Sequence, residues 1–166
     1  MICVEQSKDI VDYLVSLTPI CVALFVAHIS LRQARISREK LRLDLYNKRF
    51  EIYEITLSFY QSITSYDPSE DKVFRLINRS FIKAMKEAQF LFDSQSGIYQ
   101  ILQKMHEDSF KVTGFKRMGA ELHSADPLAC SKMHTEMQDV LTSFSFRIDM
   151  IEKAIAPYLN FHKVVV

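Results

Sequence analysis

An uncharged apolar stretch near the start of the chain constrains most strongly what this sequence can fold into. Nineteen residues, 13–31, lie between Asp12 and Arg32 and carry no formal charge when His28 is neutral. As a helix they rise roughly 28 Å, which is about the hydrocarbon thickness of a bilayer. The stretch is therefore a signal peptide, a membrane span or a buried helix of a soluble bundle.

The charges on either side of this stretch favour a membrane span. A secretory signal carries positive charge before its apolar run, whereas Glu5, Asp9 and Asp12 here outnumber Lys8, and arginines follow the run. The positive-inside rule then places residues 1–12 outside, 13–31 in the inner (cytoplasmic) membrane and 32–166 in the cytoplasm. We expect a single-pass protein, with the buried helix as the alternative.

One side of the predicted span carries small residues. They lie within about 60° of arc at helical spacing, and they are Ser16, Ala23, Ala27 and Ser30. Small side chains let helix backbones approach closely in lipid, where the hydrophobic effect does not drive association. The sequence has one span, so this face predicts contact with another copy or another protein. The alternative is a chance arrangement of common residues.

A run of arginines, the basic ladder, follows the span. It consists of Arg32, Arg35, Arg38, Arg42 and Arg49. Anionic lipid headgroups attract basic residues close to the membrane, but on a straight helix Arg49 lies roughly 25 Å beyond Arg32. The surface potential decays over about 8 Å at physiological salt. Arg42 and Arg49 therefore require another partner: a carboxylate such as Glu51 or Glu54 of an adjacent copy, a ring lining a vestibule, or water.

The rest of the sequence predicts helices. Glycine and proline are absent between Pro19 and Pro68, so the span is expected to continue as one helix with two apolar stripes. "DPSE" at 67–70 predicts a capping box before a second helix. A third helix is expected from Gly97, weakening at Gly114 and Gly119, and "SADP" at 124–127 caps a fourth that Pro157 ends. The tail "YLNFHKVVV" is expected to be extended and to pack on the bundle or on a neighbouring copy. The predicted fold is all-α, one span continuing into a cytosolic bundle of about four helices.

Composition excludes several classes of function. A net charge of +1 argues against a dedicated nucleic-acid binder. The three cysteines, Cys3, Cys21 and Cys130, are too far apart in sequence for a zinc knuckle or a redox pair. No glycine-rich phosphate loop or other common enzyme motif occurs. We expect no metal, no cofactor and no nucleic-acid partner.

One pair of residues has the spacing of a ribonuclease motif. Arg117 and His123 match the arginine–five–histidine pattern of HEPN ribonucleases. In that chemistry histidine manages the 2′-hydroxyl proton and arginine steadies the phosphate. A match of this kind is expected by chance in a chain this rich in arginine and histidine, so these residues are weak catalytic candidates.

The order of the segments resembles a known family. The apolar span is followed by "KLRLDLYNKRFEIYE", "AQFLFD" and "RIDMIEKAIAPYLNF", which is similar to a widespread family of small bacterial membrane-anchored helical proteins. More distantly, the layout resembles a small membrane pore protein that accompanies RNA-guided antiviral nucleases. The first resemblance implies the architecture, and the second implies an oligomeric pore.

Three hypotheses for function follow. The leading one is a non-enzymatic membrane protein that self-associates as a homo-oligomer, as a pore or scaffold in a bacterial defence-type response, with the anionic bilayer as a further partner. The second is a membrane-tethered sensor or adaptor that binds a cytosolic protein. The third is a tethered HEPN-like ribonuclease acting through Arg117 and His123.

Overall fold

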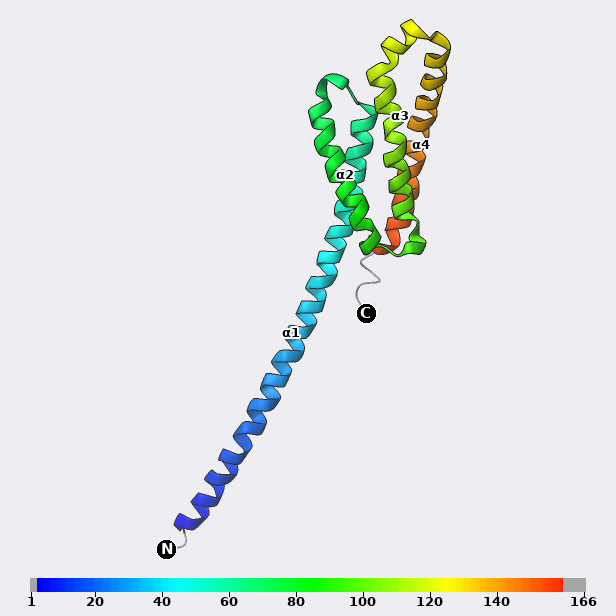
Figure 1. Ribbon diagram of the computed structural model, residues 1–166. Coiled ribbons are helices and arrows are strands. Elements are labelled where there is room, and N and C mark those ends of the chain that lie inside the picture. Colours follow the sequence, from blue (N-terminus) through cyan, green and yellow to red (C-terminus); the bar gives the residue numbers. More distant parts are fainter. Residues whose placement is uncertain (1–2, 160–166) are drawn as a thin grey trace. The chain divides into compact units, whose positions relative to one another are not determined.

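The computed structural model describes the backbone of residues 3–159 and the side chains of residue 15 and residues 17–159. The described backbone is all-helical and contains no strand. Its elements in chain order are α1 (Cys3–Thr64), a 3-10 turn η1 (Pro68–Glu70), α2 (Asp71–Leu91), a second 3-10 turn η2 (Ser94–Ser96), α3 (Ile98–Ala125) and α4 (Pro127–Leu159). Figure 1 labels the four α-helices. The all-α prediction is confirmed.

Helix α1 continues past the apolar stretch, as the absence of glycine predicted. It ends at Thr64, where Lys116 of α3 donates hydrogen bonds to the carbonyls of Thr64 (3.3 Å) and Tyr66 (2.8 Å). These bonds satisfy carbonyl groups that have no partner within the helix. The ammonium group also complements the negative end of the helix dipole. A contact distant in sequence therefore helps to end this helix.

The connection to α2 differs in part from the predicted capping box. Asp67 is an N-cap, since its carboxylate accepts a hydrogen bond from the Ser69 amide at 2.8 Å, and Pro68 takes the first helical position. Glu70, however, makes no capping hydrogen bond. Residues 68–70 form a 3-10 turn instead, and α2 begins only at Asp71.

The other two connections are short and carry their own local signals. Gly97, at φ +70°, takes the left-handed conformation between η2 and α3, which costs little without a Cβ. Asp126 alone separates α3 from α4. Its carboxylate accepts from the amides of Leu128 (3.1 Å) and Ala129 (3.0 Å), which confirms the predicted cap.

Three expectations about α3 and α4 are wrong in detail. Helix α3 runs through Gly114 and Gly119 without interruption, because packing against α4 outweighs a cost of about 1 kcal/mol per glycine. Helix α4 continues two residues beyond Pro157. Proline has a helical φ, and in the last turn its missing hydrogen bond and the crowding of its ring do not prevent the chain from completing the helix. Tyr158 and Leu159 are consequently helical instead of extended. The rest of the predicted tail, 160–166, lies outside the described residues.

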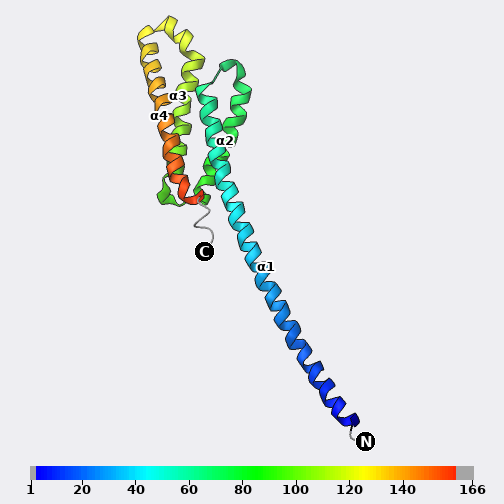
Figure 2. The same cartoon turned by 180° about the vertical axis from the view of Figure 1, so that it is seen from behind.

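The chain divides into two compact units, Met1–Asp44 and Leu45–Val166. In the second unit the last part of α1, then α2, α3 and α4 alternate in direction, and the views in Figure 1 and Figure 2 agree on this. The closest helix pair is α3 and α4. This unit is an antiparallel helical bundle of the kind that short connections produce.

The bundle core joins residues from all four helices. The rings of Phe59 (α1) and Phe81 (α2) stack with centroids 3.8 Å apart. Fully buried side chains around them include Ile52, Ile63, Ile98, Leu102, Met105, Val112, Phe144, Ile151 and Ile155. One of the two predicted stripes on α1 is buried at Ile52, Phe59 and Ile63 and half-buried at Ile55. The other, tyrosine-rich stripe is only partly covered, and it consists of Tyr46, Phe50, Tyr53, Leu57 and Tyr60.

Candidate functional site

The described part of the first unit is one helix with an exposed apolar stretch over residues 17–31. Every described side chain between residues 17 and 44 is exposed. Large apolar side chains take part, with Leu24 67% and Phe25 66% exposed. Among the described residues, the Leu17–Thr64 part of α1 is long and apolar enough to cross a membrane. A soluble protein normally buries an apolar stretch of this length.

The small-residue face lies on this exposed helix. Ala23, Ala27 and Ser30 are exposed, while the side chain of Ser16 is outside the described set. The Ser30 hydroxyl donates to the Val26 carbonyl at 2.9 Å within the same helix. This bond satisfies the hydroxyl proton, so Ser30 can lie in an apolar medium without an unpaired donor.

The five arginines of the basic ladder fall into different units. Arg32, Arg35, Arg38 and Arg42 are exposed in the first unit, whereas Arg49 belongs to the bundle and is half-buried. The basic ladder is therefore continuous in the sequence, but its first four arginines are exposed in the first unit and its last is half-buried in the bundle.

Arg49 has its partners inside the chain. Its Nε donates to the carbonyl of Leu91, the last residue of α2, at 2.9 Å. Its guanidinium also lies 5.0 Å from the ring centre of Tyr158 and 5.9 Å from that of Phe92, and these two rings make an edge contact. Arg49 thus joins α1 to the ends of α2 and α4 through a helix-end carbonyl and two cation–π contacts.

Arg117 lies in a polar cluster where α1, α2 and α3 meet. Its Nη2 pairs with the Asp71 carboxylate, and its Nε donates to the Tyr66 hydroxyl oxygen at 2.7 Å. The Tyr66 hydroxyl in turn donates to Asp71 at 2.8 Å, and Arg75 also contacts Asp71 at 2.6 Å. The Tyr66 hydrogen bond, together with the two arginines, holds the pKa of Asp71 below its usual value.

Arg117 and His123 lie on different sides of α3. At 100° per residue, six positions put them about 120° apart around α3. His123 is exposed in the last turn of α3 and makes no hydrogen bond or ion pair with any described residue. General acid–base chemistry needs both groups within reach of one phosphate. The guanidinium of Arg117 is instead engaged by Asp71 and Tyr66.

A buried ion pair that the sequence analysis missed joins α3 to α4. Asp108 is 4% exposed, and its carboxylate contacts Arg147 at 2.8 Å and Lys104 at 3.1 Å. Burial alone would raise the pKa of Asp108, but these hydrogen bonds outweigh burial and keep the pKa below its usual value. The sequence did contain one signal that Asp108 is buried. Asp108 falls at helical spacing between Met105 and Val112, which are apolar and face the core of the bundle.

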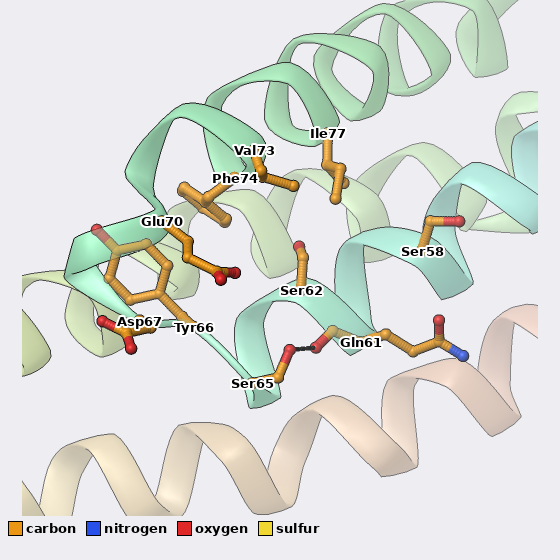
Figure 3. A pocket seen from close by; sticks show the side chains of 10 residues that line it. All are labelled: Ser58, Gln61, Ser62, Ser65, Tyr66, Asp67, Glu70, Val73, Phe74 and Ile77. Atoms are coloured by element: carbon orange, nitrogen blue, oxygen red, sulfur yellow. Dashed lines mark hydrogen bonds between the residues drawn. The ribbon is translucent and has the colours of Figure 1, made fainter.

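The clefts described on the bundle are shallow grooves. One, of about 350 Å³, lies between the last turns of α1 and the first turns of α2, with Ser58 and Ser62 opposite Val73 and Ile77 (Figure 3). Its serine hydroxyls donate to carbonyls of their own helix. The serine oxygens can therefore only accept hydrogen bonds from a molecule in the groove. None of the residues that line this groove forms a nucleophile paired with a general base. Among the residues described, no group of His, Cys, Asp and Glu is placed to hold a metal.

Comparison of the chain with protein-family models, curated protein sequences and solved structures gives no match. The chemistry and packing of its own residues therefore define the class: a helical-bundle protein with one N-terminal helix suited to cross a membrane.

Proposed function

We propose that this chain is a non-enzymatic membrane protein that self-associates through its N-terminal helix. The observation that carries the proposal is the exposed apolar surface of residues 17–31. Lipid covers most of such a surface, and close helix packing at the face of Ala23 and Ala27 covers the remainder. The basic residues that follow support a location of the bundle on the cytoplasmic side of the inner membrane, by the positive-inside rule.

The experiment is a measurement of mass in detergent. The full chain is expected to form a particle of several copies with a defined mass. Ala23→Phe or Ala27→Phe should disperse it, because a bulky ring prevents close backbone approach. Cys21→Phe, which adds a ring on the opposite side of the same helix, is the matched control and should keep the wild-type mass. A monomeric wild-type particle would exclude self-association.

The finer form of the proposal is an oligomeric pore or scaffold for a bacterial defence-type response. A pore and a scaffold differ in whether the assembled copies conduct. Dye release from liposomes carrying the reconstituted oligomer separates them: a pore releases the dye in proportion to oligomer content, and a scaffold retains it. The Ala27→Phe variant gives the background in either case.

A membrane-tethered adaptor is the second candidate, and one observation favours it. Near their connection, α3 and α4 expose apolar side chains, with Met118 of α3 61% and Leu128 of α4 84% exposed. Exposed apolar groups on a bundle end suit a protein partner. A stable monomer with a co-purifying partner that survives deletion of residues 1–31, and that Leu128→Asp releases, would support the adaptor over the oligomer.

A further inference from the structure

The outer side of α2 carries a line of exposed basic residues that the sequence analysis did not single out. This α2 face surrounds the exposed Leu76 and consists of Lys72, Arg75, Leu76, Arg79, Lys83 and Lys86. Its basic members follow one another at intervals of three or four positions, so they lie on one side of the helix over roughly 21 Å. Leu76, within this positive charge, is 64% exposed.

The outer side of α4 carries a face of similar design but with acidic residues. This α4 face consists of exposed residues at alternating intervals of four and three positions, which are Thr135, Asp139, Thr142, Phe146, Asp149 and Lys153. Phe146, between the two aspartates, is 65% exposed. Each of the two faces therefore combines an exposed apolar side chain with charged neighbours, and the predominant charges are opposite.

The two faces lie on opposite sides of the bundle, on helices that run in the same direction (Figure 1 and Figure 2). Contacts with α3 fix their relative level. Phe81 of α2 lies against His106, and Asp108 contacts Arg147 of α4 at 2.8 Å. Because α3 runs antiparallel to both helices, Arg79 is level with Asp108, and hence with Arg147, to within about one helical turn.

A second copy placed alongside in the same orientation brings complementary residues to the same level. Each pair is within about one turn of level, and the pairs are Lys72 with Asp139, Arg79 with Asp149, Leu76 with Phe146, and Glu87 with Lys153. Among the described residues, the first four of these charged groups have no ion-pair partner within the chain. Apolar contacts at the centre with charged pairs around them are usual in protein interfaces.

We propose that the α2 face packs on the α4 face of a second copy of this chain. The inference rests on the proposed self-association, because copies inserted in one membrane share an orientation. The contact is heterologous: each copy offers its α2 face to one neighbour and its α4 face to the other, and the contacts close into a ring where the rotation between copies allows it. The charged pairs select the neighbour and the register more than they add affinity.

Disulfide formation between copies of the full chain in detergent tests the contact. Leu76→Cys is combined with Thr142→Cys in a background with Cys3→Ser and Cys21→Ser, and the buried Cys130 stays. Positions 76 and 142 lie on opposite sides of one bundle, so a bond between them joins two copies. The matched control combines Leu76→Cys with Thr135→Cys, the same substitution on the same side of α4 but roughly 10 Å further from the level of position 76.

We expect the 76–142 variant to form a ladder of disulfide-linked multimers beyond the dimer, at least tenfold faster than the 76–135 variant. A variant with either cysteine alone can form dimers only. Arg79→Glu should slow the 76–142 reaction, and adding Asp149→Arg should restore its rate. A reaction that Asp149→Arg does not restore would overturn the proposed pairing in favour of another anion, a lipid or nucleic-acid phosphate, on the α2 face.

The mass of the wild-type particle separates a failure of this contact from a failure of self-association. A particle of several copies whose 76–142 variant forms no bond between copies, or forms it no faster than the 76–135 variant, would contradict the contact between α2 and α4 alone. A monomeric particle without the 76–142 bond would contradict both the contact and the proposed function.

Discussion

Arg49 belongs to the basic ladder by its spacing in the sequence, but its contacts lie within the bundle. It continues the sequence spacing of the basic ladder, but it binds the Leu91 carbonyl and lies against Tyr158 and Phe92. Its position five residues after the boundary at Asp44 places this contact at the start of the bundle. Its role is to attach α1 to the ends of two other helices.

We therefore predict that Arg49→Ala destabilises the bundle. The loss of one hydrogen bond and two cation–π contacts should lower the free energy of unfolding by about 1–2 kcal/mol. Arg49→Lys should restore only part of this loss, because an ammonium group cannot bond the carbonyl and stack on the rings as a planar guanidinium does.

Chemical denaturation followed by circular dichroism measures the effect of the Arg49 variants. Arg38→Ala is the control, since Arg38 is exposed in the other unit. An Arg49→Ala protein as stable as the wild type would show that the contact contributes nothing to bundle stability.

At the residue scale the sequence could identify which charges were unusual but not what they bind. The distance argument predicted that Arg49 needs a partner other than lipid headgroups, and Arg49 does have partners within the chain. Its partner, a backbone carbonyl 42 positions away, leaves no trace in local sequence. Arg117 matched a ribonuclease motif by spacing alone. Spacing within α3 contains no information on the ion pair that Arg117 makes with Asp71 of α2.

At the scale of elements, the packing of α2 against α3 contains a histidine that resists protonation. His106 lies 6.3 Å from the ring of Phe81 and 5.1 Å from that of Phe110, and its buried Nε2 has no hydrogen-bond partner among the described residues. Burial, with a smaller contribution from Lys86, lowers the pKa of His106 below 6.5, against the opposing effect of Glu107.

This histidine predicts acid-sensitive stability. The unfolded chain takes up the proton more readily than the folded one, so acid favours unfolding. The stabilising contribution is complete above pH about 6.5 and decreases as the pH falls below that value. The melting temperature should decrease as the pH is lowered from 7.5 to 5.5. His106→Leu should reduce this dependence of the melting temperature on pH. His123→Ala, at an exposed position, should not change it.

The contact between α3 and α4 contains the buried pair Asp108–Arg147. Arg147→Met should lower the free energy of unfolding by about 2 kcal/mol, because it removes the closest partner of a buried carboxylate and leaves only Lys104. The double variant Asp108→Leu/Arg147→Met should recover most of the loss, since no buried charge then remains unpaired. A double variant less stable than either single one would show that the pair itself is the main stabilising contact.

The helix ends separate what was predictable from what was not. The caps at Asp67 and Asp126 are local hydrogen bonds between neighbouring residues, and the sequence predicts both. The continuation of α3 through Gly114 and Gly119 depends on packing along α4, which a local propensity does not contain. The pairing of Asp108 with Arg147 was not predicted for the same reason, because the two residues are 39 positions apart and meet only through helix packing.

At the scale of the whole molecule, the division at Asp44 and Leu45 predicts that the bundle folds without the first unit. The fragment 45–166 contains the whole described core, from Ile52 to Ile155. We expect it to be helical, to stay in solution without detergent and to unfold in one cooperative transition. Calorimetry of the purified fragment measures this, and a fragment that needs detergent to remain folded would contradict it.

The single residue that joins α3 to α4 also has a consequence for the order of events during folding. Asp126 closes the smallest possible loop between the two most closely packed helices, so their association requires little loss of chain entropy. Contacts that are local in sequence form early and quickly. We expect this hairpin to be the folding nucleus and the segment of α1 around Phe59 to join last. Val140→Ala would then slow refolding, whereas Ile52→Val would mainly speed unfolding.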